Sequence, residues 1–599
     1  MPHHSFWWEG LDGTKVFAHF SPIDTYNALL LPSQLRFAER NYRDHAGSSH
    51  SLVLYGHGDG GGGPTQTMIE RGRLAKDLDQ VPRVTFDKVD HFFTQLMDEY
   101  RDDAPVWNGE MYFEKHRGTY STQLGTKQGN RWSERLLHEL ELWSAAVGFR
   151  PATIDELWQR VLTQQFHDII PGSSIAWVHQ DAEAEFAAVA EEIEVILARL
   201  IPVEQGPTHV LNPAPVAVQQ VVDIDGAPAF VNVAPFGTSA PEAVLPEWFA
   251  DIVQVTESQN AWHITNGHLY VSISHDGTIT SLSNGRRSVF PAGHSPAFTL
   301  RNDRPAEYDA WDIDMADANA APTMTLHNGV AALVEHSPMR AIVECSYATD
   351  ASQFTVRYTI AAGSPRLDIA LDANWQENEQ RLQWCLPTDI HAREAVFGTQ
   401  FGHVRRPRHS NTSWDLAQFE VCGHRYASVH EPRFGVALLA DGPRGYDVRG
   451  DEIRLTVLRA PRFPDPFADR GRQKIEWSVM LTEGDPIVHG VEREAARIAH
   501  PLRIVDGVPQ VTPFHVDLDI DGVMISALKP ADDDNGDIIV RLWETTGGRA
   551  QGTLSIPGFA VVSECDALEV PQGDAWRTTD GAIPLTLEAF QIRTLRLSK

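Results

Sequence analysis

The chain has 599 residues, a length that predicts several domains rather than one. Hydrophobic residues make up 42% of it, which is enough for ordinary cores and excludes a disordered chain. The formal net charge of −31 argues against nucleic acid or an anionic membrane as partner, and a neutral or cationic ligand fits better.

The cysteine content and the N-terminal sequence indicate the cellular location of the protein. Four cysteines are scattered without a C-x-x-C pair, so a disulfide framework or a cysteine-zinc site is not expected. The opening MPHHSFWWEGLDG has no positive segment followed by an apolar one, so no signal peptide is expected. No apolar run is long enough to span a bilayer. These features together predict a cytoplasmic location.

The first 85 residues predict an α/β arrangement, because short apolar runs alternate with glycine-rich loops. Residues 14–20 and 51–56 are predicted strands, and residues 67–78 are a predicted helix. The second strand leads directly into the loop HGDGGGGPT at 57–65. Strand, glycine loop and helix in this order predict a site at the carboxyl end of a parallel strand.

Residues 86–203 predict a three-helix bundle, because apolar residues recur at helical spacing between short breaks. The spacing runs over 89–100, 132–147 and 178–200, and Thr153 with Glu156 predicts a capping box for a further helix that stops at Pro171. From 204 to 599, short β-branched and aromatic runs alternate with turn residues, which predicts β-sandwich domains. The predicted fold is therefore multidomain: α/β, then α, then β.

The segment QQFHDIIPGSS (164–174) places His167 and Asp168 at the predicted end of a helix. Imidazole and carboxylate are common zinc ligands, and the partial negative charge of a helix C-terminus favours a cation. One histidine and one aspartate do not complete a site, so other ligands must come from elsewhere. The alternative is a solvent-facing pair without a ligand, and the pattern alone favours it.

The glycine loop presents a single carboxylate, Asp59. A phosphate cradle is disfavoured because Pro64 and Thr65 follow the glycines where a P-loop has Lys and Ser or Thr. A carboxylate among small residues suits general acid/base work on a sugar. A flexible turn without function is an equally good interpretation of the loop by itself.

Aromatic and polar residues interleave in VWNGEMYFEKHRGTYSTQ (106–123) and in SFWWEGLDGT (5–14), which suits carbohydrate recognition as well as it suits a structural cluster. The predicted sugar-binding residues from these segments are Trp8, Glu110, Tyr112, Arg117 and Tyr120.

Four segments together resemble glycoside hydrolase family 38, the α-mannosidases, in its cytosolic and bacterial branch. They are SFWWEGLDGT, YGHGDGGGGPT, NGEMYFEKHRGTYSTQ and LWQRVLTQQFHDIIPGSS, and RRPRHSNTSWDLAQFEVCGHRYA, GYDVRG and RAPRFPDPFAD are similar to the same branch. The resemblance covers essentially the whole chain. It implies the C-terminal part of an α/β catalytic domain at 1–85, the middle domain at 86–203 and the mannosidase C-terminal region at 204–599.

The resemblance also implies an activity: zinc-dependent, retaining hydrolysis of terminal α-linked mannose from oligosaccharides, in glycan catabolism. His167 matches a zinc ligand of the family and Asp168 an acid that contacts sugar hydroxyls. Asp59 lies where the acid/base is expected. The ligand set for zinc, or for another divalent metal, is incomplete in this chain.

Members of the family also carry a His-x-Asp zinc motif and a nucleophilic aspartate, and neither motif is recognised here. We therefore expect an α-mannosidase that lacks the N-terminal part of the catalytic domain, with little activity by itself. Glu9, Asp12, Asp24 and Glu110 are candidates for the second carboxylate, and nothing in the sequence selects one. The alternatives are a non-catalytic carbohydrate-binding remnant and the partner of a separately encoded N-terminal half; a homo-oligomer also stays open.

Overall fold

A computed structural model describes residues 2–578 and 581–599. The chain divides into two compact units, residues 1–111 and residues 112–599. The predicted boundaries after residues 85 and 203 stay predictions.

The first unit combines a small sheet with three α-helices, α1 (Pro32–Asn41), α2 (Gln66–Leu74) and α3 (Val89–Tyr100). The sheet has the order β2-β1-β3, with β1 at Ser5–Glu9, β2 at Lys15–His19 and β3 at Val106–Asn108. β1 pairs antiparallel with β2 and parallel with β3, which places Trp8 opposite Trp107. The carboxyl ends of β1 and β3 therefore meet at one edge of this sheet.

Two elements predicted for the first unit form as expected and one does not. The strand predicted at 14–20 is β2, and the helix predicted at 67–78 is α2 followed by a 3-10 turn at Ala75–Asp77. The strand predicted at 51–56 is wrong: this stretch forms a single parallel bridge, Tyr55 with Ala28. One bridge provides too few hydrogen bonds to extend a ladder.

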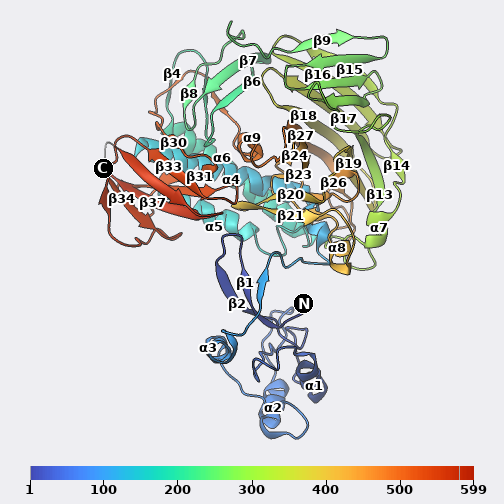
Figure 1. Cartoon of the computed structure of the whole chain (residues 1–599), viewed down its shortest axis with the longest axis vertical. Coiled ribbons are helices and arrows are strands. Elements are labelled where there is room, and N and C mark those ends of the chain that lie inside the picture. Colours follow the sequence, from blue (N-terminus) through green and yellow to red (C-terminus); the bar gives the residue numbers. More distant parts are fainter. Residues whose placement is uncertain (1, 579–580) are drawn as a thin grey trace. The chain divides into compact units, whose positions relative to one another are not determined.

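Three long helices follow the start of the second unit, α4 (Leu124–Val147), α5 (Ile154–Gln164) and α6 (Ala176–Leu200). They pack on one another, and α4 also packs against β31 (Val523–Pro530) of the C-terminal sheets (Figure 1). Apolar residues of α4, α5 and α6 share one core with those sheets, including Leu140, Leu157 and Val540. The helical region and the last sheets are therefore one packed body.

The prediction for α5 needs two corrections. Thr153 precedes the helix but has helical backbone angles and makes no side-chain cap, so the capping box is absent. The helix ends at Gln164 instead of reaching Pro171. The side-chain amide of Gln165 donates to Asn130 (2.9 Å) and Glu134 (3.1 Å) on α4, and the chain then continues as turns.

The region from 203 onward is built mainly from antiparallel sheets, as predicted. The largest has nine strands in the order β15 (Val330–His336), β16 (Arg340–Ala348), β17 (Gln353–Ala361), β18 (Arg366–Trp375), β27 (Gly471–Thr482), β24 (Phe434–Ala440), β23 (Tyr426–Glu431), β20 (Glu394–Thr399) and β21 (Gly402–Pro407). A six-stranded sheet has the order β14 (Met324–Thr325), β13 (Ala297–Asn302), β19 (Gln380–Pro387), β26 (Glu452–Arg459), β25 (Gly445–Asp447) and β22 (Val421–Cys422). Side chains of both sheets, among them Trp384 and Trp477, fill one hydrophobic core.

Smaller sheets complete the second unit. A four-stranded sheet has the order β12 (Ile279–Ser283), β11 (Tyr270–Ser274), β10 (Ala261–Thr265) and β9 (Gln254–Glu257). The C-terminal β-sandwich has β31, β32 (Ile538–Glu544), β37 (Ile592–Ser598), β34 (Val561–Cys565) and β35 (Trp576–Arg577) in one sheet, and β30 (Asp517–Asp519), β33 (Ala550–Ser555) and β36 (Ala582–Leu587) in the other.

The remaining pairings are β28 (Arg503–Val505) with β5 (His209–Leu211) and β8 (Thr238–Ser239), β29 (Val508–Pro509) with β4 (Val203–Glu204), and β6 (Val218–Ile224) with β7 (Ala227–Val233); the short helices are α7 (Met315–Asn319), α8 (Ser413–Ala417) and α9 (Val491–Ala499). No helix in the described part of the chain is long and apolar enough to cross a membrane.

Candidate functional site

Asp59 lies exposed in a loop, and two side chains of another loop hold its carboxylate. The Tyr26 hydroxyl donates to Oδ1, and the Asn27 side-chain amide donates to Oδ2 over 2.8 Å. The Asn27 side-chain oxygen in turn accepts from the backbone N–H of Gly58 at 2.6 Å and of Asp59 at 3.3 Å. Asn27 therefore fixes both the backbone and the carboxylate of Asp59.

The glycines close this loop into a tight turn. His57 and Gly62 exchange two backbone hydrogen bonds, N to O at 3.1 and 2.8 Å. Gly56 has a φ of +125°, and a Cβ there would lie 3.2 Å from the backbone carbon of Gly63, so both the backbone angle and the close approach require glycine. The loop is thus an ordered turn rather than a free one.

Trp8 and Glu9 lie at the sheet edge where β1 and β3 end. The Trp8 indole N–H donates to the carbonyl of Gly109 (3.0 Å), and 39% of the residue is exposed. Glu9 pairs with Lys15 (3.0 Å) and accepts from the amide of Asn108 (2.7 Å). The Lys15 ammonium, followed by the Asn108 amide, holds the pKa of Glu9 below its usual value.

The other candidates for a second carboxylate also lie in the first unit. Asp12 accepts from the backbone N–H (3.0 Å) and hydroxyl (2.8 Å) of Thr14, and Asp24 accepts from the amide of Asn41 at 3.0 Å. Glu110 follows the end of β3. Asp12 is therefore engaged in a local turn, and Asp24 is engaged with the end of α1.

His167 and Asp168 are adjacent and exposed in the turn after α5. His167 Nε2 lies 3.5 Å from Asp168 Oδ2, and 76% and 52% of the two side chains are exposed. The Phe166 ring packs on the His167 ring with centroids 4.3 Å apart. The Ser173 hydroxyl approaches Asp168 at 3.5 Å. Both metal-capable side chains thus face solvent.

A buried lysine of α4, Lys127, anchors this turn. Its ammonium donates to the carbonyl of Ile170 (2.8 Å) and to that of Thr122. Gly172 lies so close to Thr122 that a Cβ would be 2.5 Å from its carbonyl oxygen. The turn is therefore fixed to the segment before α4.

A carboxylate from a distant loop caps that segment. The backbone N–H of Gln123 donates to Asp469 at 2.8 Å, that of Leu124 at 2.5 Å, and the Gln123 amide donates to Asp465 at 2.8 Å. A carboxylate here satisfies helix N–H groups that have no partner within α4. Burial lowers the pKa of Lys127 and raises that of Asp469, while the opposite charge of each partner counteracts the effect.

A fully buried arginine, Arg459, joins the same segment to the sandwich. It forms a bidentate ion pair with Asp303 (2.7 and 3.0 Å) and donates to the Thr122 hydroxyl at 2.6 Å. A Cβ on Gly118 would lie 2.0 Å from its guanidinium, so only glycine fits there. The sequence analysis did not single out Lys127, Arg459 or Asp469 as site residues. No spacing pattern marks them, because their partners are backbone groups or lie more than 150 positions away.

Tyr112, Arg117 and Tyr120 lie at the start of the second unit. The Tyr112 hydroxyl donates to the Phe419 carbonyl (2.9 Å), and burial raises its pKa. Arg117 is 5% exposed and donates to Asp312 (3.3 Å) and to the carbonyl of Ala417 (3.1 Å). Tyr120 ends a 3-10 turn and is half-buried. Their part in sugar binding stays a prediction.

Asp59 belongs to the first unit, and His167 and Asp168 belong to the second. The hypothesis that the three line one cavity stays a prediction. Among residues 2–578 and 581–599, no three His, Cys, Asp or Glu side chains gather as a metal-binding group. The His167–Asp168 pair has the donor atoms that zinc prefers, but it supplies two ligands where zinc sites have three or four from protein.

Comparison with known proteins shows the family domain by domain. Residues 1–110 match the glycosyl hydrolases family 38 N-terminal domain, and residues 114–202 the alpha mannosidase middle domain. Residues 264–467 match the family 38 C-terminal domain, and residues 522–595 its C-terminal beta sandwich domain. Four domain models thus match in order along one chain.

Relatives with assigned names align with the whole chain. Alpha-mannosidase 2C1 of Homo sapiens is 31% identical, alpha-mannosidase G of Dictyostelium discoideum 29% and an alpha-mannosidase of Saccharomyces cerevisiae 29%, each over 100% of this chain. The chain spans about 60% of the length of these relatives, between 59% and 62%.

The crystal structure of an alpha-mannosidase from Enterococcus faecalis V583 shares the fold, with a TM-score of 0.79 at 16% identity, over 100% of this chain and 82% of that one. Because residues 1–110 match the N-terminal domain, the prediction that the N-terminal part of the catalytic domain is missing is not confirmed. The chain belongs to glycosyl hydrolase family 38.

Proposed function

We propose that this chain hydrolyses terminal α-linked mannose from oligosaccharides, with retention of configuration at the anomeric carbon, in glycan catabolism. The observation that carries the proposal is the ordered match of four family domains, together with relatives named alpha-mannosidase that align with the whole chain. The substrate class and the reaction are inferred from those relatives.

Asp59 is the proposed general acid and base. Retaining glycosidases use one carboxyl group to protonate the leaving oxygen and then to deprotonate water. Tyr26 and Asn27 each donate to one oxygen of Asp59, which fixes the plane of the carboxyl group while leaving it exposed. A fixed and accessible carboxyl group is the geometry that proton transfer needs.

The second carboxylate should attack the anomeric carbon from a position about 5–5.5 Å from the first. Its candidates are held differently. Glu9 has a cationic partner that keeps it ionised, as a nucleophile must be, whereas Asp12 holds a local turn and Asp24 accepts from Asn41 of α1. Glu110 lies beside the sheet edge that carries Glu9.

His167 and Asp168 are proposed to contribute two ligands to a divalent metal, zinc by analogy with the family. Such an ion would act as a Lewis acid and orient sugar hydroxyls when bound. The chain's own contribution is to hold the turn: Lys127 anchors the carbonyl of Ile170, and Gly172 permits close packing on Thr122. Asp168 is also proposed to contact sugar hydroxyls.

Trp8, Glu110, Tyr112, Arg117 and Tyr120 are the proposed further sugar contacts. Trp8 offers a partly exposed ring, which suits the C–H face of a sugar. The polar atoms of Tyr112 and Arg117 already form hydrogen bonds within the protein. These residues would therefore shape the wall of a sugar site instead of forming hydrogen bonds to the sugar. A cytoplasmic location is proposed as well, supported by the scattered positions of the four cysteines, which include no C-x-x-C pair.

The test is hydrolysis of an aryl α-mannoside by the 599-residue chain, with the first-formed anomer identified by NMR. We expect α-mannose as the first product and dependence on added zinc. His167→Ala should lower the zinc content of the protein measured by mass spectrometry, whereas His91→Ala, on an exposed site of α3, should not. Absence of hydrolysis with saturating zinc would contradict the proposal.

A further inference from the structure

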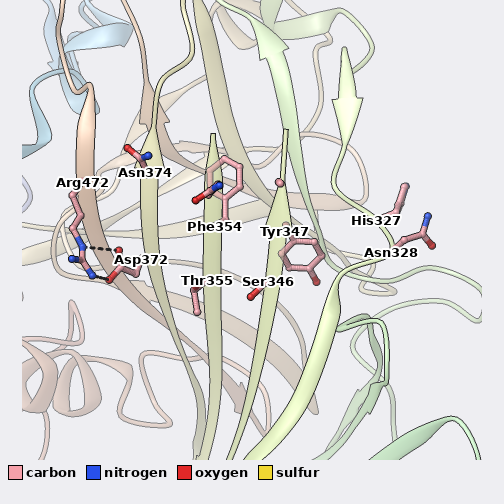
Figure 2. A pocket seen from close by; sticks show the side chains of 11 residues that line it. His327, Asn328, Ser346, Tyr347, Phe354, Thr355, Asp372, Asn374 and Arg472 are labelled. Atoms are coloured by element: carbon pink, nitrogen blue, oxygen red, sulfur yellow. Dashed lines mark hydrogen bonds and ion pairs between the residues drawn. The ribbon is translucent and has the colours of Figure 1, made fainter. Parts of the chain in front are cut away.

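The outer face of the nine-stranded sheet holds an open cavity of about 850 Å³. It is formed by β16, β17, β18 and β27, with the loop before β15 at one end, and these elements do not include the turn that carries His167 and Asp168. Figure 2 shows the side chains along this groove; they are His327, Asn328, Ser346, Tyr347, Phe354, Thr355, Asp372, Asn374 and Arg472, with Ala348 and Gln353 completing the lining.

Strand register arranges the polar residues in two rows across the sheet. Ser346 pairs with Thr355, which pairs with Asp372. In the next row, Gln353 pairs with Asn374, which pairs with Arg472. Residues two apart on a strand share a face, so both rows point outward, and neighbouring strands lie about 4.8 Å apart. This spacing is close to the length of one pyranose unit in a sugar chain.

The hydrogen-bonding capacity of these rows is largely unused. Within the described part of the chain, the side chains of Gln353, Ser346 and Thr355 make no hydrogen bond to protein. Asn374 accepts from the amide of Gln376 (2.9 Å), which leaves its own N–H groups for a ligand. Amides and hydroxyls that both donate and accept match the hydroxyl groups of a sugar.

Charge and shape indicate the ligand class. The two formally charged side chains of the lining, Asp372 and Arg472, form a bidentate ion pair (3.2 and 2.9 Å), so the groove has no net charge from them. A neutral ligand fits such a surface better than a phosphate or a nucleic acid. Tyr347 points to the opposite, core side of the sheet: its hydroxyl donates to the Gly277 carbonyl (3.2 Å) and its ring lies beside Phe298, with centroids 6.3 Å apart. The outward-facing contacts of the groove are therefore polar.

We propose that this groove is a second carbohydrate site, which binds a neutral, mannose-containing oligosaccharide chain along the two rows. The choice of mannose rests on the proposed function; the choice of a neutral sugar rests on the groove. Binding here would keep a long glycan attached to the protein while its ends are trimmed, because a second contact raises the local concentration of the chain.

The test is affinity electrophoresis of the full chain in native gels that contain soluble α-mannan or, separately, dextran. The double variant Gln353→Ala/Asn374→Ala should reduce retardation by mannan about tenfold in apparent affinity. Arg357→Ala is the matched control: it removes an exposed ion pair with Glu344 (2.8 Å) on the same face, outside the cavity, and should be retarded like the unmodified chain.

Retardation of the double variant equal to that of the unmodified chain would overturn the proposal, and so would equal retardation by dextran. Hydrolysis of a small aryl α-mannoside, measured in the same preparations, should be the same for the double variant and the unmodified chain. An unmodified chain that mannan retards but that hydrolyses nothing would contradict the proposed function while leaving the groove assignment standing.

Discussion

Residues 1–111 and residues 112–599 hold their candidate site residues in different ways. In the first unit, Asp59 is exposed and held by two side chains, Tyr26 and Asn27, and the buried residues of this unit form only small clusters. In the second, the turn with His167 is also exposed, but buried charges such as Lys127 lie directly beneath it. From this difference we expect that a substitution at the site of the first unit lowers activity without lowering stability. A substitution beneath the site of the second unit should lower both.

The largest expected effect is on activity, at Asp59. Asp59→Asn keeps the shape but removes proton transfer, and we expect hydrolysis of an unactivated α-mannoside to fall by about 10²–10⁴-fold. The midpoint of urea unfolding should not change, because the carboxylate is exposed. Asp79→Asn, at another exposed position of the first unit, is the control and should retain full activity. A clear loss of stability in Asp59→Asn would contradict the expectation that activity and stability are independent in the first unit.

Next comes the anchor of the second unit. Lys127→Met leaves the carbonyls of Thr122 and Ile170 without this donor and removes one of the cations that act on Asp469. The free energy of unfolding should fall by about 3–5 kcal/mol. Zinc affinity should fall in the same variant, because the His167 turn is released. Lys474→Met, at an exposed site on β27, should change neither quantity in urea melts and zinc titrations. Unaltered stability in Lys127→Met would show that the buried charges do not support the turn.

Acid should weaken the first unit through His19. Burial, followed by the nearby His4, lowers the pKa of His19 from 6.5 to about 4, and its Nε2 accepts from the backbone N–H of Leu52 (3.2 Å). The unfolded chain therefore binds a proton below pH 6.5 that the folded unit rejects. Stability should be complete above pH 6.5 and decline by up to roughly 3 kcal/mol as the pH falls towards 4.

Hydrogen exchange at the Leu52 amide measures this change. Its protection should decrease from pH 6.5 to 4 beyond the intrinsic pH dependence of exchange. His19→Gln should remove that excess, and His91→Gln, on exposed α3, should preserve it. A protection factor that stays constant over this range would refute the role of His19.

The smallest effect is expected at the sheet surface of the second unit. Arg357→Ala breaks one exposed ion pair with Glu344, and the free energy of unfolding should change by less than about 0.5 kcal/mol. Thermal unfolding of this variant checks the value. A larger loss would mean that exposed charges, and not only buried ones, stabilise the second unit.

Helices with long apolar periodicity could be predicted from the sequence, because their spacing is a local property. The helices at 89–100 and 178–200 form close to the predicted bounds. The end of α5 could not be predicted, because Gln165 turns toward Asn130 on another helix. The stretch 51–56 has strand composition, but a strand needs a partner, and local sequence does not say that one is missing.

The same limit applies to the candidate site. Asp59 could be singled out by its glycine loop, yet Tyr26 and Asn27, which hold it, carry no signal at their own positions. His167 with Asp168 could be singled out as a donor pair, while the lysine that anchors their turn looks like any helix-surface lysine until its burial is known. Residues that perform chemistry have recognisable types, whereas those that position them are defined by the fold.

The cap of α4 has a consequence for synthesis on the ribosome. Asp469 accepts from the N–H groups of Gln123 and Leu124, yet it lies about 345 positions later in the chain. At about 5–20 residues per second, roughly 20–70 s pass between translation of the helix start and translation of its cap. During that interval the first turn of α4 is incomplete, and the turn that carries His167 lacks its final support. The second unit is therefore expected to reach its native packing late, after residue 469 has left the exit tunnel, and chaperones that hold nascent chains have a defined window in which to act.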